Sequence, residues 1–127
     1  MRTTTGDDAV RKGRLGKAEQ FHRVATDALA LVDEHQEVAD AVVTLCVHAG
    51  IAASDAICVA ALGKHAQGQD HNEAVTLLKT VDKEAGKHLN TLLSMKTRAG
   101  YGYNPVTAEQ LKKAIRAMEA LIVTAQA

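Results

Sequence analysis

Apolar and polar positions alternate with a helical period along most of the chain. From residue 14 to residue 32 the apolar positions recur every three or four residues, which predicts an amphipathic helix. The next stretch, Glu37 to Gly63, is apolar on nearly every side and contains neither Lys nor Arg. An α-helix that is apolar all round has to be buried all round. We therefore expect this stretch to be the central helix, ended by Gly63, with the other helices packed on it.

Two helices are expected after the turn at Gly68, Gln69 and Asp70. Asp70 is followed three residues later by Glu73, a spacing that predicts the capped start of a short helix over residues 71–81. Asp82 can cap a further helix. Its apolar positions continue at helical spacing, so we expect this helix to run from Lys83 to Arg98.

A loop precedes the last predicted helix. The stretch Gly100 to Pro105 contains two glycines, an asparagine and the only proline, all of which interrupt regular structure. Thr107 and Gln110 form a second capping pattern, and apolar residues then recur at helical spacing up to Ala125.

Together these elements predict an all-α protein. The connections are short, and short connections make sequential helices antiparallel neighbours. We expect an up-down helical bundle of four long helices plus one short helix, in one domain over residues 14–126. Residues 1–13 show no apolar period, so we expect them to form a flexible N-terminal tail.

Composition narrows the functional classes. Aromatic residues make up 2% of the chain, which disfavours a sheet and also disfavours platforms that stack nucleic-acid bases. The net charge is zero, although residues 25–63 hold six acidic and no basic side chains. The chain therefore lacks the overall charge of a nucleic-acid-binding protein, and its charge distribution suits pairing with itself or with a partner.

Cys46 and Cys58 are expected to be core residues. They lie about 120° apart on a helix, so they cannot bridge each other, and buried free thiols are typical of a reducing compartment. The N-terminus has no apolar signal region. His48 and Asp55 within the apolar helix argue against a membrane span. We expect a cytoplasmic protein that does not enter a membrane.

Three segments in this order resemble the HEPN-domain family. They are the small-residue central helix, the short helix that opens with Asp70, and the segment Leu92 to Ile122. The last segment is similar to the closing part of HEPN domains, where a helix ends in Arg and is followed by a small residue, Tyr and Gly, then by a capped final helix. The resemblance covers roughly residues 15–122, and its most specific piece is Arg98-x-x-Tyr101-Gly102.

The resemblance implies a helical bundle that usually dimerises. Many HEPN domains are metal-independent ribonucleases of toxin–antitoxin or defence systems, with a motif of Arg, a polar residue, three variable residues and His. Here Arg98 supplies the Arg, but Ala99 holds the polar position and Tyr103 the His position. A tyrosine with an ordinary pKa near 10 is a poor general acid or base at neutral pH.

The family therefore implies two functions for this chain. The first is a non-catalytic, homodimeric binding or regulatory module that contacts RNA or a nucleotide phosphate, or a protein such as a nucleotidyltransferase-like or toxin or antitoxin partner. The second is a ribonuclease toxin that uses Arg98 with Tyr103 or with a displaced histidine such as His48.

Four residues are candidates for binding: Arg98, Tyr101, His48 and Asp55. Arg98 and Tyr101 form either an anion site or an ordinary ion pair and loop contact. His48 and Asp55 are seven residues apart, so they lie on one face of the central helix, where they form either a polar pocket for a small ligand or a buried hydrogen-bond network. Arg98 is the expected partner of Asp55, because guanidinium pairs well with carboxylate.

Other chemistry is sparse. His65, Asp70 and His71 match no compact metal-binding spacing, so we expect no metal, and the chain contains no cofactor-binding motif. The basic run Arg11 to Lys17 is either a solvated surface or a phosphate contact.

Overall fold

The computed structural model describes residues 1–68 and 70–127 and shows an almost entirely helical chain. The elements in order are β1 (Thr3–Thr5), α1 (Asp8–Leu31), the 3-10 helix η1 (His35–Val38), α2 (Ala39–Leu62), β2 (Lys64–Ala66), α3 (His71–Val81), α4 (Lys83–Ser94), α5 (Lys96–Gly100) and α6 (Ala108–Gln126). The all-α class predicted from the sequence is confirmed. Gln69, part of the expected turn, lies outside the described residues.

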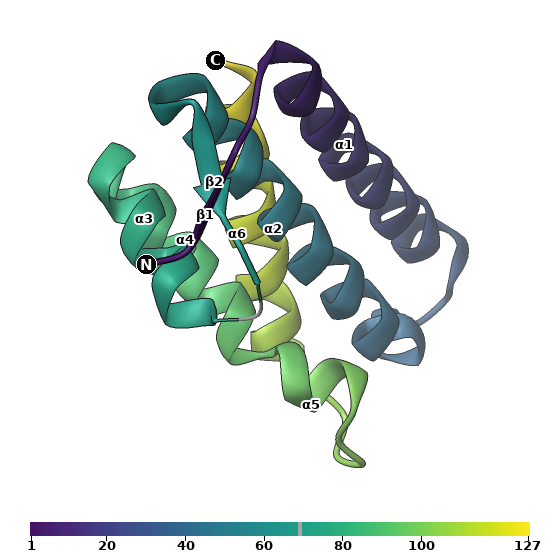
Figure 1. Ribbon diagram of the computed structural model, residues 1–127. Helices are drawn as coiled ribbons and strands as arrows, with labels where there is room; N and C mark the ends of the chain where they lie inside the picture. Colours follow the sequence, from purple (N-terminus) through teal and green to yellow (C-terminus); the bar gives the residue numbers. More distant parts are fainter. Residues whose placement is uncertain (69) are drawn as a thin grey trace.

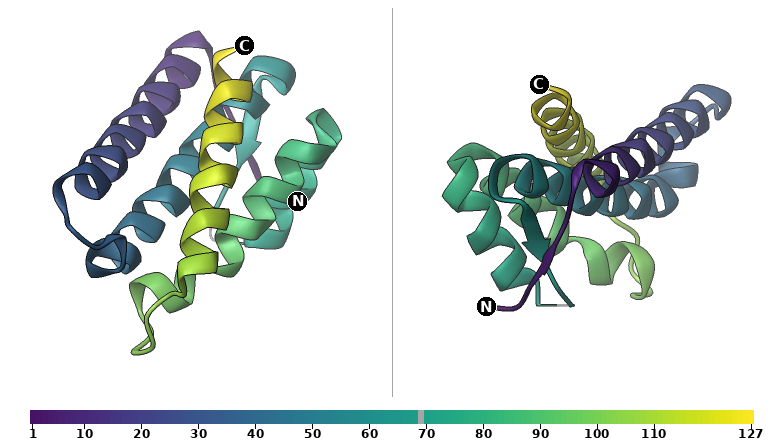
Figure 2. Two further views of the ribbon diagram at one scale, coloured as in Figure 1. Left: turned by 180° about the vertical axis from the view of Figure 1, so that it is seen from behind. Right: turned by 45° about the horizontal axis from the view of Figure 1, so that its top comes forward.

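α2 is the central helix, as its apolar sequence predicts. It contacts α1, α3, α4, α5 and α6, and fourteen of its residues are buried. Figure 1 shows α1 on one side of α2, α3 and α4 on the other, and α5 at one end of the bundle. The view from behind in Figure 2 shows α6 lying along the bundle between α1 and the α3–α4 pair. Gly63 ends α2 with a left-handed backbone (φ 70°), as expected.

Gly50 allows close packing at the centre of α2. A Cβ atom at this position would lie 2.4 Å from Leu92 Cδ1 of α4 and 3.3 Å from Leu121 Cδ1 of α6. Because real Cβ atoms do not approach other atoms as closely as 2.4 Å, any other residue at this position would force the Leu92 side chain to move.

The N-terminal segment differs from the expected flexible tail. β1 pairs antiparallel with β2, with Thr4 opposite His65, and α1 begins at Asp8 rather than near Arg14. Asp7 caps α1 by accepting a hydrogen bond from the backbone N–H of Val10 at 3.0 Å. The first turns of α1 were missed because their side chains are mostly exposed and show no apolar period.

The predicted end of the helix over residues 83–98 is also wrong. It breaks at Met95, which separates α4 from the five-residue helix α5. Met95 N–H bonds to the carbonyl of Leu92, three residues back, so the chain turns more tightly there than in an α-helix. Over the described residues the bundle thus has three long helices, α1, α2 and α6, and the shorter helices α3, α4 and α5, so the expected four long helices are not confirmed.

One helical stretch, His35–Leu62, is long and apolar enough to cross a membrane by length and composition alone. In the bundle 72% of its most apolar window is buried by the other helices. This is the environment of a core helix and is compatible with a soluble protein.

Candidate functional site

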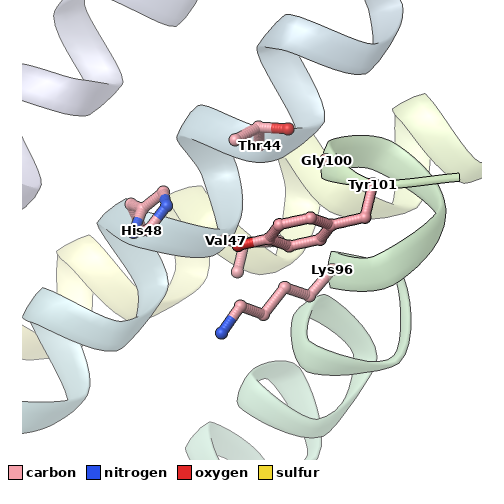
Figure 3. Close-up of a pocket in the computed structure, with 6 residues that line it drawn as sticks. All are labelled: Thr44, Val47, His48, Lys96, Gly100 and Tyr101. Carbon is pink, nitrogen blue, oxygen red and sulfur yellow. The ribbon is translucent and has the colours of Figure 1, made fainter.

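A groove runs along one edge of α2 and contains two adjoining cavities. The first has a volume of about 140 Å³ and is lined from α2 and from the segment of α5 that follows the break at Met95. Its lining residues, drawn in Figure 3, are Thr44, Val47, His48, Lys96, Gly100 and Tyr101. Two of the four residues expected to bind, His48 and Tyr101, therefore line one cavity.

Three polar side-chain ends meet in this first cavity. Figure 3 shows the imidazole of His48, the hydroxyl of Tyr101 and the ammonium of Lys96 turned toward the same space. Imidazole and hydroxyl groups can donate hydrogen bonds, and an ammonium donates three. The arrangement is suited to holding an anionic group.

Local structure positions His48 and Tyr101. The His48 ring lies 5.9 Å from the ring of Phe21, centroid to centroid, so α1 supports it from the side. Tyr101 follows α5, whose last turn closes through bonds from the N–H groups of Tyr101 and Gly102 to the carbonyl of Thr97. The Tyr101 side chain is 80% exposed, which places it at the mouth of the cavity rather than in the core.

The second cavity continues the groove toward α3. It has a volume of about 200 Å³ and shares His48 and Lys96 with the first. Its remaining lining residues are Ile51, Gly68, Asp70, His71, Ala74 and Leu93. Apolar side chains thus form part of its wall, and one carboxylate, Asp70, stands at the end near the start of α3.

The loop beyond Tyr101 is tied to the start of α2 and to the 3-10 helix η1 that precedes it. The backbone N–H of Val106 donates to Asp40 Oδ1 at 2.9 Å, and Gln36 Nε2 donates to the Val106 carbonyl at 2.6 Å. Val106 itself is buried. The role of Asp40 in holding this loop was missed, because no sequence pattern links residues 66 positions apart.

The predicted pairing of Arg98 with Asp55 is wrong. Arg98 Nε donates instead to the backbone carbonyl of Pro105 at 3.0 Å, which fastens the loop between α5 and α6. Arg98 lines neither cavity of the groove. Arg98, Tyr101, His48 and Asp55 therefore do not converge on one place, and the structure gathers only His48 and Tyr101.

Asp55 belongs to a separate ionic cluster. Its carboxylate accepts a hydrogen bond from Arg14 Nε of α1 at 3.0 Å and lies 3.8 Å from His65 Nδ1 of β2. Burial raises the pKa of the Asp55 carboxyl above its ordinary value, and the neighbouring Arg14 and His65 oppose that rise. The hydrogen-bond network considered for Asp55 is thus present, with Arg14 and His65 as its partners.

The remaining candidates take structural positions. Tyr103 is 95% exposed, and the Thr107–Gln110 capping box is present. Asp70 Oδ1 caps α3 by accepting from the N–H groups of Asn72 and Glu73. Among the described residues no group of three or more His, Cys, Asp or Glu side chains gathers as a metal site would require.

Both cysteines are free and buried in the core, as expected. Burial raises the pKa of the Cys46 thiol to about 12 and that of the Cys58 thiol to about 11. Because the thiolate is the reactive form, neither cysteine is suited to nucleophilic chemistry.

Comparison of the chain with protein-family models finds no match, and comparison with curated proteins finds no related protein. The functional argument therefore rests on the residues and the geometry.

Proposed function

We propose that this protein is a non-catalytic, HEPN-like binding module that holds an anionic group of its ligand between His48, Lys96 and Tyr101. The observation that carries the proposal is the convergence of these three side chains on one cavity. The anion we propose is phosphate, as part of an RNA or a nucleotide, in keeping with the family that the sequence resembles.

The absence of catalysis is proposed from the surroundings of Arg98 and Tyr103. A general acid or base has to be held within hydrogen-bond reach of the proton that it transfers. Tyr103 is 95% exposed at the tip of a loop, and Arg98 Nε is engaged by the Pro105 carbonyl. Incubation of the purified protein with RNA is expected to leave the RNA intact, and cleavage that is abolished by Arg98→Ala would overturn the non-catalytic proposal.

Anion binding is tested by titration calorimetry with inorganic phosphate and with a short RNA oligonucleotide. Lys96→Met removes the ammonium but keeps an unbranched side chain, and it should weaken phosphate binding about tenfold, the loss expected for one charge-assisted contact. Lys113→Met, which removes an exposed lysine of α6 away from the groove, is the matched control and should leave the affinity unchanged. Equal losses in the two variants would contradict the proposed site.

The same proposal includes a partner. The resemblance implies a second copy of this chain, and a nucleotidyltransferase-like or toxin or antitoxin protein as a further binding partner. Sedimentation velocity over a range of concentrations tests the homodimer, and a purely monomeric protein at high concentration would remove it from the proposal.

A further inference from the structure

The second cavity contains both a positive and a negative side chain, whereas an anion site needs only the positive one. Lys96 lies where the two cavities meet, and Asp70 lies at the far end, near the start of α3. Among the described residues these two opposite charges do not form an ion pair with each other, although they line the same cavity. Each is therefore placed to meet a charge on a ligand.

The Asp70 carboxylate is held in position by the helix that it caps. Both of its capping bonds use Oδ1, at 2.9 Å to the N–H of Asn72 and at 3.2 Å to the N–H of Glu73. The cap thus orients the carboxylate while Oδ2 takes no part in either bond. A carboxylate held at this end of the cavity repels an anion and attracts a protonated amine.

The wall between the two charges is apolar. Ile51, Ala74 and Leu93 line the second cavity between α2, α3 and α4. The groove follows α2 from Thr44 to Ile51, seven residues, which corresponds to about 10 Å along the helix axis. A ligand that spans both cavities is therefore small, with an anionic end, a cationic end and carbon atoms that contact the apolar wall.

We propose that the groove binds a small zwitterion, whose anionic group meets Lys96 and His48 and whose ammonium group meets Asp70. The inference rests on the proposed anion site and adds the chemistry of the other end of the ligand. An amino phosphate and an α-amino acid share this chemistry, and they differ in whether phosphate or carboxylate supplies the anion.

The test compares ligands that differ only by the amine. O-phosphoethanolamine is matched with ethyl phosphate, and L-leucine with 4-methylpentanoate, each titrated into the full chain by calorimetry or by ligand-observed NMR. The zwitterion should bind about fivefold more tightly than its amine-free match, the gain expected from one solvent-accessible charge pair. A gain in the phosphate pair alone identifies an amino phosphate, and a gain in the leucine pair alone identifies an amino acid.

Asp70→Asn is the decisive variant, because asparagine caps helices about as well as aspartate and leaves α3 intact. It should abolish the preference for the zwitterion without weakening the amine-free anion. Asp82→Asn is the matched control, since Asp82 caps α4 in the same way, by accepting from Ala85 N–H at 2.9 Å, and does not line the groove. It should keep the preference.

The outcomes separate this inference from the proposed function. If ethyl phosphate binds in a Lys96-dependent manner but O-phosphoethanolamine and L-leucine bind no better than their matches, the zwitterion inference is overturned and the anion site stands. A preference that survives Asp70→Asn also overturns it. If no anion binds to the wild-type chain, the anion site fails as well.

Discussion

His48 and Asp55 are seven residues apart on α2, yet they lie in two different kinds of environment. The Asp55 side chain is 16% exposed and has Arg14 and His65 as partners within the protein. His48 is exposed and faces a cavity that it shares with Lys96 and Tyr101. Both were expected to lie on one face of the helix and to contribute to one site. Instead, Asp55 forms ion pairs with α1 and β2, and His48 lines an open groove.

The difference shows how a structural role and a ligand-binding role can be distinguished for a polar residue on an apolar helix. A buried carboxylate that is satisfied by groups of its own chain stabilises the packing of those groups, here of α1 and β2 on α2. A polar side chain whose neighbours are other polar ends around a cavity can offer its hydrogen bonds to a ligand. The partners of a polar residue, rather than its position on the helix, separate the two roles.

The largest expected effect comes from breaking the Asp55 cluster. Arg14→Met removes the guanidinium but keeps an apolar stem, and it leaves the half-buried carboxylate without its closest cation. We expect the free energy of unfolding at pH 7 to fall by about 1–3 kcal/mol, measured by urea denaturation. Arg23→Met, at an exposed position of α1, should change it by less than about 0.5 kcal/mol. Similar losses in both variants would show that the cluster does not stabilise the fold.

The pH dependence of the stability loss in Arg14→Met tests whether Arg14 acts through the charge of Asp55. A carboxyl group whose pKa is raised in the folded state contributes stability that is present below its unfolded pKa and is lost as pH rises through its folded pKa. Burial already raises the pKa of Asp55, and removing Arg14 should raise it further. The deficit of Arg14→Met should therefore be largest at neutral pH and shrink as pH falls through the raised pKa. A deficit that stays constant would mean that Arg14 acts through packing alone.

A change at His48 should alter the affinity of the groove rather than the stability of the fold. His48 faces Lys96 and Tyr101 in the first cavity and Asp70 and His71 in the second. An imidazole can donate a hydrogen bond to an anion, so removing it should weaken anion binding a few-fold. Sulfate, titrated by calorimetry at pH 7, is a suitable probe because its charge does not change near that pH. His48→Ala should show this loss of affinity, and an unchanged affinity would exclude His48 from the site.

The smallest expected effect is the coupling between the two regions. His48 and Asp55 are separated by about 10 Å along α2, and effects at such separations usually add within about 0.5 kcal/mol. The stability losses of Arg14→Met and Lys96→Met should therefore sum in the double variant. A coupling well above that value would show that the cluster and the groove form one energetic unit.

Much of the fold follows from local sequence signals. The buried character of α2, its end at Gly63 and the caps at Asp70, Asp82 and Thr107 are all readable because each depends on residues a few positions apart. β1 was missed because a three-residue strand carries almost no periodicity. The break at Met95 was missed because the apolar pattern of α4 continues through it without a glycine or proline.

The candidate site was predicted only in part, for a related reason. The importance of His48 and Tyr101 could be inferred from residue type, but their meeting with Lys96 depends on the break at Met95 and on the loop that Asp40 and Gln36 hold. The partner of Asp55 was wrong because the choice between Arg98 and Arg14 depends on how α1 lies on α2. No spacing within the sequence encodes that geometry.

Gly50 is linked to the groove through α4, although it does not line the groove itself. It lies in the core and lines neither cavity, but the missing methyl group leaves room for the Leu92 side chain of α4 against the backbone of α2. α4 leads through Met95 directly into α5, which supplies Lys96 and precedes Tyr101. A larger residue at position 50 would displace Leu92, and the disturbance would lie only three residues before the break at Met95 from which the groove wall starts.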